Sequence, residues 1–453
     1  MALSGFGDAA AFFDMSRLGK FFVCAACLLA SCVAGVCAES EAELLDVLVR
    51  RGVLTQQESL DVGKMAVASV ESVKSFSRIR LFSFWHLRYQ YFDHRYSNSQ
   101  SLDKNNFAIR RIIPVLIADL TESSRVLLTL YLPSNSLINT ARYEYNIDNG
   151  YLCGSLWIGY EAVFFCMEEN ESGMRIMTPD RSVINMYFGG GDHGFSDGYV
   201  NSHTTPAAFS GYHTGVFWNG KFVKNKSLIY RLAVTNSKPE GVKFDACNSM
   251  AFWASFGCDK ADESGGYRLR AGVNGGYSMR VVSAAASAVY PSRVADYGDC
   301  FGVNPYLWLN YKNFTLQSEF VLTSMKYGKS RSNNYALYTV NSPRANPFGY
   351  YALIAYKLDA RPFGEFEPVF RYSAINSDGR GLAENGILYK AENRGGIFNT
   401  VDCFYGGVNW YVLGNALKYQ IGVEYARFRD GVVGDVSKSS DVVMFIAQMQ
   451  MVF

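Results

Sequence analysis

Apolar and polar residues alternate along many short segments of this chain. Residues 441–453 show the pattern most clearly, because one side of an extended strand would carry only apolar residues while the other carries two glutamines. The apolar side holds Val443, Phe445, Ala447, Met449, Met451 and Phe453, opposite Gln448 and Gln450. Successive side chains of a strand point to opposite faces. A strand of this kind that ends in an aromatic residue is typical of the closing strand of a transmembrane β-barrel.

The same division returns in residues 78–91, 267–274, 314–320, 365–372 and 417–425. In residues 78–91, one face is charged or polar (Arg78, Arg80, His86, Arg88, Gln90), and we expect this face to lie in water. The apolar faces carry Tyr, Trp and Phe at their ends, as the aromatic girdles of membrane barrels do. A soluble β-sandwich with a large core is the alternative fold.

The connections between these segments differ in length. Residues 312–313 and 413–415 are short links, whereas the polar stretches around 93–104, 326–346 and 376–401 are expected to be long loops. Short turns on one side and long loops on the other are typical of outer-membrane barrels. We therefore predict an all-β fold in which residues 78–453 form a transmembrane antiparallel β-barrel. Strands of about 9–11 residues leave room for about 16 strands.

The first 77 residues have a different character. Arg17 and Lys20 precede an apolar run over residues 21–36, which predicts a signal peptide over residues 1–38. Met15 is an alternative start, and residues 29–32 (Leu-Ala-Ser-Cys) resemble a lipobox, so lipidation of Cys32 stays open. Residues 39–77 carry helical spacing and a capping box at Thr55 and Glu58, which predicts a short periplasmic helical segment. The predicted location is the bacterial outer membrane.

Composition and charge exclude several function classes. The chain has 30 Tyr, 32 Phe and 41 Gly against 11 Pro, which favours many strands joined by turns. Its net charge of +2 argues against a nucleic-acid-binding protein. Neither the histidines nor the cysteines show a metal-binding or acid–base spacing, so we expect no metal, no cofactor and no enzymatic activity. The histidines are His86, His94, His193, His203 and His213, and the cysteines are Cys153, Cys166, Cys247, Cys258, Cys300 and Cys403. The spacing of the cysteines does not reveal which of them would pair in disulfides.

Several motifs together resemble the phosphate-selective porin O/P family of outer-membrane channels. They are residues 44–55, Asn-Phe-Ala-Ile-Arg-Arg at 106–111, Trp-Ile-Gly-Tyr at 157–160, residues 313–320, Phe-Arg-Tyr-Ser at 370–373, residues 407–411 and the terminal strand. The resemblance implies a 16-stranded, usually trimeric barrel with a constricted lumen whose arginines and lysines pass small anions. Arg110 and Arg111 match an arginine pair of that path.

The chain departs from the family pattern at two places. It has Tyr-Leu-Pro at 131–133 where the family has Tyr-Asp-Phe, and the usual Gly-x-Phe-Lys-x-Pro-Phe segment is not recognisable between Met167 and Arg181. The resemblance therefore leaves the permeant anion open. The glycine-rich residues 189–194 lack the strand-then-helix context of a nucleotide-binding loop and are expected to form a loop that could fold into the lumen.

Inward arginines are the candidate selectivity residues, because a planar guanidinium can donate two parallel hydrogen bonds to a phosphate or carboxylate. We predict pore-lining or anion-binding roles for Arg78, Arg80, Arg88, Arg110, Arg111, Arg268, Arg270 and Arg371. The alternative is that Arg110, Arg268 and Arg270 merely pair with lumen carboxylates. Glu319, Glu365, Glu367 and Glu424 are the carboxylates expected for such pairs.

Arg111 does not fit strict alternation. Alternation places it on the outer face with Phe107, Ile109 and Ile113, unless a β-bulge turns it inward or it snorkels to an interface.

The predicted function is a porin for passive diffusion of small hydrophilic solutes, with a preference for anions and phosphate among the candidates. Its expected partners are outer-membrane lipid, small anions and two further copies of the chain in a homotrimer. A non-selective or carbohydrate-conducting porin and a plugged structural or adhesive barrel are the alternatives.

Overall fold

The structure is a computed structural model that describes residues 78–96, 101–132, 138–151, 153–189, 209–223, 226–236, 250–262, 266–280, 298–326, 344–379, 381–382, 384–388, 398–431 and 438–453. Nearly all of these residues belong to one compact unit, residues 80–117 and 123–453, and the fold below is the fold of this unit. The predicted signal peptide, the helical segment 39–77, the lipidation of Cys32 and the choice of start all lie outside the described residues.

The described residues form one antiparallel sheet. Its strands are β1 (Arg78–Tyr96), β2 (Ser101–Asp119), β3 (Ser124–Leu130), β4 (Ile138–Asp148), β5 (Cys153–Ala162), β6 (Tyr212–Lys221), β7 (Leu228–Asn236), β8 (Met250–Ala261), β9 (Tyr267–Arg280), β10 (Gly298–Tyr311), β11 (Phe314–Lys326), β12 (Arg344–Ala345), β13 (Phe348–Tyr356), β14 (Leu358–Asp359), β15 (Glu365–Asn376), β16 (Thr400–Tyr411), β17 (Leu417–Arg429) and β18 (Ser439–Val452). Because β12 and β14 have only two residues each and continue the two ends of β13, sixteen strands build the wall in this part of the chain.

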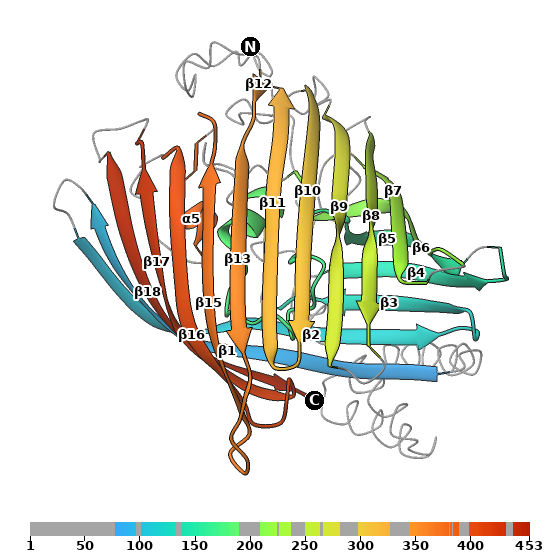
Figure 1. The fold of residues 1–453 in the computed structure, drawn as a ribbon, viewed down its shortest axis with the longest axis horizontal. Coiled ribbons are helices and arrows are strands. Elements are labelled where there is room, and N and C mark those ends of the chain that lie inside the picture. The colour runs from blue at the N-terminus through green and yellow to red at the C-terminus, as the bar shows by residue number, and fades with distance from the viewer. Residues whose placement is uncertain are drawn as a thin grey trace, which may run out of the picture. The chain divides into compact units, whose positions relative to one another are not determined.

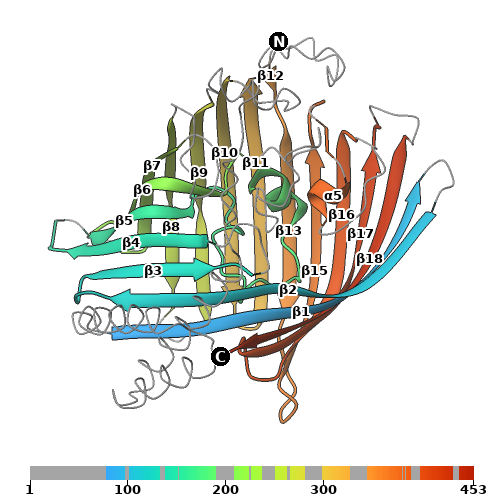
Figure 2. The same cartoon turned by 180° about the vertical axis from the view of Figure 1, so that it is seen from behind.

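The sheet closes on itself. Each strand pairs with its neighbour in the sequence, and β1 also pairs with β18, with Trp85 opposite Met451 and Tyr91 opposite Phe445. Figure 1 shows the resulting ring of strands, and Figure 2 shows it from behind. Closure gives backbone N–H and C=O groups partners on both sides, which a sheet within lipid requires. The prediction of a 16-stranded antiparallel barrel is confirmed.

Alternation along the strands separates an outer from an inner face. In β13, every second residue is exposed, including Tyr350, Ile354 and Tyr356, and the residues between them are buried. The predicted division of β18 is confirmed, since Met444, Ile446, Gln448 and Gln450 all turn to the buried side. The exposed apolar residues continue around the wall, among them Val216, Phe252, Phe320, Phe404 and Ile421. Such a continuous apolar surface fits a lipid environment. No helix in the described ranges is long and apolar enough to cross a bilayer.

The connections alternate in length along the chain. Residues 120–123, 312–313 and 412–416 are short turns, whereas β9 ends at Arg280 and β10 begins at Gly298, and β15 ends at Asn376 and β16 begins at Thr400. The expected loop over residues 93–104 is wrong, because β1 continues to Tyr96 and β2 begins at Ser101. Asp93, His94 and Arg95 stay paired with β18, since polar side chains at a strand end do not prevent backbone pairing.

Candidate functional site in the lumen

The connection between β5 and β6 lies inside the barrel. We call its described part, residues 163–189, the inner loop; most of its side chains are buried. It ends in the π-helix η1 (Asn185–Gly189), which contacts the short helix α5 (Glu384–Ile387) from the connection between β15 and β16. Figure 1 shows the inner loop in green within the ring of strands. Two connections therefore share the lumen and narrow it.

Aromatic side chains pack this connection against the wall. The ring of Phe165 lies 4.8 Å from that of Phe209, which lies 5.1 Å from Trp253 of β8. Inward glycines make room for these rings, because a Cβ atom at Gly302 would lie 2.4 Å from the ring of Phe209. Gly276 of β9 leaves similar space beside Trp253 and Phe209. The wall and the connection fit as a packed core.

The inner face of β1 differs from the expectation. His86, Arg88 and Gln90 do point inward, but they are at most 2% exposed. The expectation that this face lies in water is wrong, because the inner loop covers it. A covered polar face needs hydrogen-bond partners, which the inner loop provides for Arg88 and Gln450 provides for His86.

Asp180 ties the inner loop to three strands. Its carboxylate accepts hydrogen bonds from Arg88 of β1 at 2.7 and 2.9 Å and from Arg110 of β2 at 3.3 Å. Its backbone carbonyl accepts one from Arg371 of β15 at 2.8 Å, and the guanidinium of Arg371 also pairs with Glu424 at 2.9 Å. The three arginines are almost fully buried. Charge-assisted hydrogen bonds are strong, so Asp180 is a firm anchor.

A second anchor lies at the start of the inner loop. The carboxylate of Glu319 on β11 accepts from the backbone N–H groups of Met167 at 2.6 Å and Glu168 at 2.9 Å. Asn304 of β10 donates to Glu319 at 3.0 Å and accepts from the N–H of Cys166 at 3.1 Å. Cys166 has a left-handed backbone with a φ of 60°. These contacts satisfy the polar backbone groups at the strained residue.

Strands β16 to β18 supply a third set of contacts. Lys418 donates to the backbone carbonyls of Met174 at 3.1 Å and Ile176 at 3.0 Å. Gln450 donates to the carbonyl of Met174 at 3.2 Å, and Asn409 donates to that of Met177 at 2.9 Å. The inner loop is thus fixed to the wall formed by β15–β18, β1 and β2 and, at its start, to β10 and β11.

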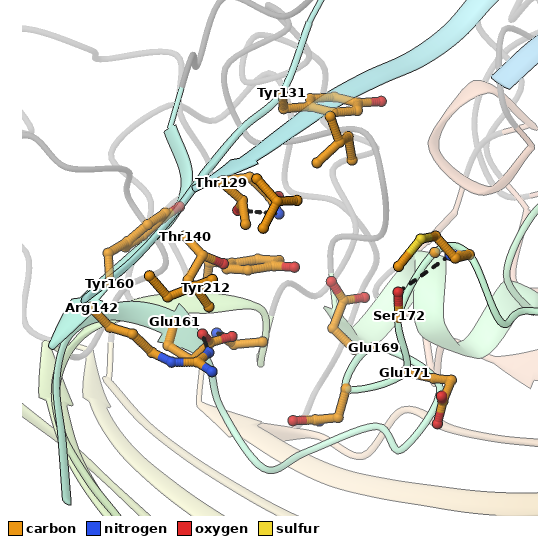
Figure 3. A pocket seen from close by; sticks show the side chains of 18 of the residues that line it. Thr129, Tyr131, Thr140, Arg142, Tyr160, Glu161, Glu169, Glu171, Ser172 and Tyr212 are labelled. Carbon is orange, nitrogen blue, oxygen red and sulfur yellow. Dashed lines mark hydrogen bonds and ion pairs between the residues drawn. The ribbon is translucent and has the colours of Figure 1, made fainter. Parts of the chain in front are cut away.

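The rest of the lumen contains an open cavity of about 480 Å³. Residues of β1 to β7 and of the inner loop line it. In Figure 3, Arg142, Glu161 and Tyr212 on the wall face Glu169 and Glu171 of the inner loop across the open space. The cavity therefore lies between the wall and the inner loop.

Several charges of this lining have ion-pair partners. The lining holds four arginines and three glutamates, which are Arg111, Arg142, Arg181 and Arg231 and Glu161, Glu169 and Glu171. Arg142 forms ion pairs with Glu144 and Glu161 and lies 3.8 Å from the ring centroid of Trp157. Glu171 pairs with Arg270 at 2.9 Å. The lining therefore carries one more cation than carboxylates.

Arg231 of β7 makes a different kind of contact. Its guanidinium carbon lies 5.5 Å from the ring centroid of Phe164, a cation–π contact. It makes no ion pair with any carboxylate in the described part of the chain, and it lines the cavity. Its charge is therefore available to an anion in the cavity.

Comparison with known proteins identifies the family. The model of the family described as phosphate-selective porin O and P matches residues 86–453. The chain belongs to this family. It is an outer-membrane porin, which confirms the predicted family and location. Among curated proteins, none matches the sequence of this porin.

Solved porins share the fold. The anion-selective porin from Comamonas acidovorans is 8% identical, with a TM-score of 0.52, and the match covers 83% of this chain and 99% of that one. The outer-membrane channel DcaP of Acinetobacter baumannii is 12% identical, with a TM-score of 0.46, over 82% of this chain and 97% of that one. At these identities the likeness concerns the fold alone. Family and fold indicate a channel rather than an enzyme.

The predicted arginines of the porin occupy different places. Arg88, Arg110 and Arg371 bind the inner loop, whereas Arg111 lines the cavity. Arg110 pairs with Asp180, a residue of the inner loop, and not with a strand glutamate.

The remaining arginines lie elsewhere on the wall. Arg268 is half exposed and pairs with Asp259 at 2.9 Å, while Arg270 lies 4.1 Å from the ring centroid of Trp308 and pairs with Glu171. Arg78 is exposed and Arg80 is half-buried.

Arg111 turns inward against strict alternation. Before it, Phe107 and Ile109 are exposed on the outer face, whereas Arg111, Ile113 and Val115 are buried and line the cavity. The expectation that Arg111 and Ile113 face outward is wrong. Up to Arg110, the even-numbered residues of β2 point inward, and from Arg111 onward the odd-numbered residues do. One extra residue inserted in a strand has the same effect.

Three residues of the site were missing from the prediction. They are Asp180, Arg142 and Arg231. Arg231 stands alone between Tyr230 and Leu232 in an apolar strand, and Arg142 alternates with Tyr143 and Tyr145. A single arginine on the polar side of a strand was the available signal. Asp180 had none, because it lies in a loop without periodicity.

The histidines and cysteines occupy buried or unremarkable positions. His86 bonds Gln450 at 2.9 Å, and His213 bonds the carbonyl of Asn236 at 2.8 Å. Within the described residues, no group of three or more metal-ligating side chains comes together. Cys153, Cys166, Cys258 and Cys403 form no disulfide, and His193, His203, Cys247 and most of residues 189–194 lie outside the described ranges.

Proposed function

We propose that this porin passes small anions in preference to cations, through the space between the inner loop and the wall of β1–β7. The observation that carries the proposal is Arg231, which lines the cavity without an ion pair among the described residues. An arginine at a constriction attracts anions and repels cations. The Comamonas porin with a similar fold is described as anion-selective, which agrees with this proposal.

The arrangement favours passage over retention. A channel conducts only if its binding site releases the ion again. Arg142 is neutralised by Glu144 and Glu161, and Arg181 donates to the carbonyls of Glu168 and Glu171, each at 3.0 Å. The attraction of the cavity therefore comes from a small surplus of charge, which suits a mild preference.

The eight predicted arginines divide into three roles in this proposal. Arg111 acts on the permeating anion, because it lines the cavity. Arg88, Arg110 and Arg371 keep the inner loop in place and so set the width of the passage. Arg78, Arg80, Arg268 and Arg270 lie outside the cavity lining and add to the field of the wall.

Reversal potentials in a potassium chloride gradient test the selectivity. We expect the refolded porin in a planar bilayer to prefer chloride, and Arg231→Gln to reduce that preference severalfold. Arg231→Lys keeps the charge and should retain it. Arg361→Gln is the matched control, because Arg361 is exposed, pairs with Asp359 and lies outside the cavity lining. Equal permeability of both ions in the wild type would contradict the proposal and favour a non-selective or carbohydrate-conducting porin.

A plugged structural barrel is the second candidate. The inner loop and α5 form a continuous apolar core with the wall, which includes Phe188, Leu388, Val401 and Phe428. A lumen filled to this extent could be closed. Planar-bilayer recording distinguishes the two, because a closed barrel gives no discrete conductance steps.

The proposal includes partners that remain to be tested. We expect a homotrimer in outer-membrane lipid, as the family resemblance implies, with no cofactor and no catalytic activity. Light scattering of the detergent-solubilised protein, corrected for bound detergent, measures the number of chains. A monomeric mass would contradict the trimer and leave the channel proposal intact.

A further inference from the structure

Part of the cavity wall is apolar, although it faces the lumen. Phe84 of β1 and Ile113 and Val115 of β2 form a buried cluster against which Phe82, Ile117 and Leu127 pack. All six residues line the cavity. We call these six residues the apolar wall.

The apolar wall differs from the other apolar parts of the inner face. Elsewhere, inward residues such as Val321, Leu353 and Val442 pack in the core that includes the inner loop and α5. The apolar wall packs against Met174 of the inner loop and also borders the open space, because the change of phase at Arg110 turns Ile113 and Val115 toward the lumen. Apolar groups at the edge of a water-filled passage gain free energy when an apolar ligand covers them.

Another part of the same cavity lining carries charge. Arg231 makes no ion pair among the described residues, although Asp259 attracts it from beyond ion-pair distance, and Phe164 lies beside its guanidinium. The carboxylates that also line the cavity have partners of their own, since Glu161 pairs with Arg142 and Glu171 with Arg270. Glu169 is the third carboxylate of the cavity lining, and it also interacts with another residue. An anion in the cavity would meet the carboxylate of Glu169.

We propose that this cavity is a binding site for organic anions in which one carboxylate is attached to an aromatic or branched aliphatic body. The apolar body would lie on the apolar wall and the carboxylate would face Arg231. An inorganic anion gains nothing from the apolar wall, and a neutral hydrocarbon gains nothing from Arg231. The inference rests on the proposed anion channel and adds the chemical class of its preferred solute.

The dimensions of the cavity suit such a solute. Its volume of about 480 Å³ falls within the range of small-molecule sites, about 300–1,000 Å³. Tyr131, Tyr160 and Tyr212 add aromatic surface to the lining, and each combines an apolar ring with a hydroxyl. The site therefore combines apolar contact with a few polar groups, as small-molecule sites do.

Block of the chloride current tests the proposal with three probes. Benzoate carries both features, acetate carries the charge with a minimal apolar body, and benzamide carries the ring without the charge. We expect the half-blocking concentration of benzoate to be at least about tenfold below that of acetate, from burial of the ring surface. Benzamide should block no better than acetate.

A reciprocal pair of variants assigns the apolar wall. Val115→Thr places a hydroxyl on the apolar wall at nearly constant volume, and Thr129→Val removes one from another lining position. The ratio of acetate to benzoate half-blocking concentrations should fall about threefold in the first variant and rise in the second. Arg231→Gln should weaken block by both anions about tenfold, whereas Arg361→Gln, at an exposed arginine paired with Asp359 outside the cavity lining, should leave it unchanged.

Several results would overturn the inference. If acetate and benzoate block equally, or if Val115→Thr leaves their ratio unchanged, the apolar wall binds nothing. If benzamide matches benzoate, the site does not recognise the charge. If chloride preference persists while benzoate shows no advantage, this inference fails and the proposed function stands. Calorimetric titration of benzoate into the detergent-solubilised porin tests the site even where no current flows, and absence of binding there refutes it.

Discussion

The anchor at Asp180 gives a sharp test of how the inner loop is held. Asp180→Asn keeps the shape of the side chain and removes its charge. Two buried guanidinium groups, those of Arg88 and Arg110, then face an amide in place of a carboxylate. The backbone carbonyl at position 180 still accepts from Arg371, so the variant removes one kind of contact only.

The magnitude follows from the contacts. Removing one partner of a buried ion pair costs about 3–5 kcal/mol. The asparagine oxygen still accepts one hydrogen bond, and Arg88 keeps Gln448 at 2.8 Å and the carbonyl of Pro179 at 2.9 Å. We therefore expect a loss of about 2–3 kcal/mol in the local stability of the inner loop. Since 1.4 kcal/mol is a factor of ten, the open population rises roughly 30- to 150-fold.

Hydrogen exchange of the porin in detergent measures this change directly. Amides of residues 177–182 should lose protection by about that factor, while amides of the wall, for example in β13, should keep theirs. Single-channel records should show larger and noisier conductance, because the inner loop leaves the passage. A shift of the reversal potential without a change in conductance or noise would indicate only the loss of charge at position 180, and not a displacement of the inner loop.

The control is Asp259→Asn, which removes a carboxylate from an ion pair at the exposed end of β8. Arg268 and Asp259 are both partly exposed, so this variant should change stability by less than about 1 kcal/mol. If Asp180→Asn and Asp259→Asn give the same exchange and the same noise, Asp180 is no anchor and the reasoning fails.

Three further predictions concern the connections in the lumen. Burial raises the pKa of Glu384 in α5 from 4.5 to about 7, so its contribution to stability is fully present below about pH 4.5 and is lost as the pH rises through 7. Glu384→Gln should abolish this pH dependence of hydrogen exchange in α5, and persistence of it would contradict the assignment. Burial also raises the pKa of the Cys166 thiol, so maleimide labelling followed by mass spectrometry should find it unreactive until denaturant is added. Gly302→Ala should displace Phe209 and cost about 1–3 kcal/mol of local stability by hydrogen exchange, whereas Gly275→Ala meets only ordinary contacts and should be neutral.

The wall could be predicted because two strict constraints act on every strand. One face of each strand contacts lipid, and the other faces the inside of the closed barrel. These two environments impose a period of two, as in residues 417–425, which lie within β17. The constraint weakens at strand ends, where side chains extend beyond the bilayer. For that reason the polar residues 93–96 and 101–104 concealed the ends of β1 and β2.

The inner loop could not be predicted, since its contacts join residues far apart in the sequence. Met174 meets Gln450, and Asp180 meets Arg88. Alternation says which side chains point inward but not which loop atom they meet. Thus Glu319, expected to pair with an arginine, binds backbone N–H groups, and Arg110 pairs with Asp180.

Arg111 shows the limit of periodicity within a strand. One change of phase moves every following side chain to the other face. No residue type near Arg110 marks that change, because neither glycine nor proline lies between Phe107 and Ile113. The apolar wall depends on this change of phase. Its apolar residues suggest a lipid-facing side in the sequence, whereas in the structure they face the lumen.

The two sides of the lumen can therefore vary independently. Strands β15–β18 and the inner face of β1 hold the inner loop by side chains that donate to its carbonyls and carboxylates. Changes there alter the width of the passage. Arg231 and the apolar wall line the cavity on β1–β7 and meet the inner loop at the side chains of Phe164 and Met174. Aperture and solute preference are thus set by different residues, and a combined Asp180→Asn and Arg231→Gln variant should show additive effects on conductance and on selectivity.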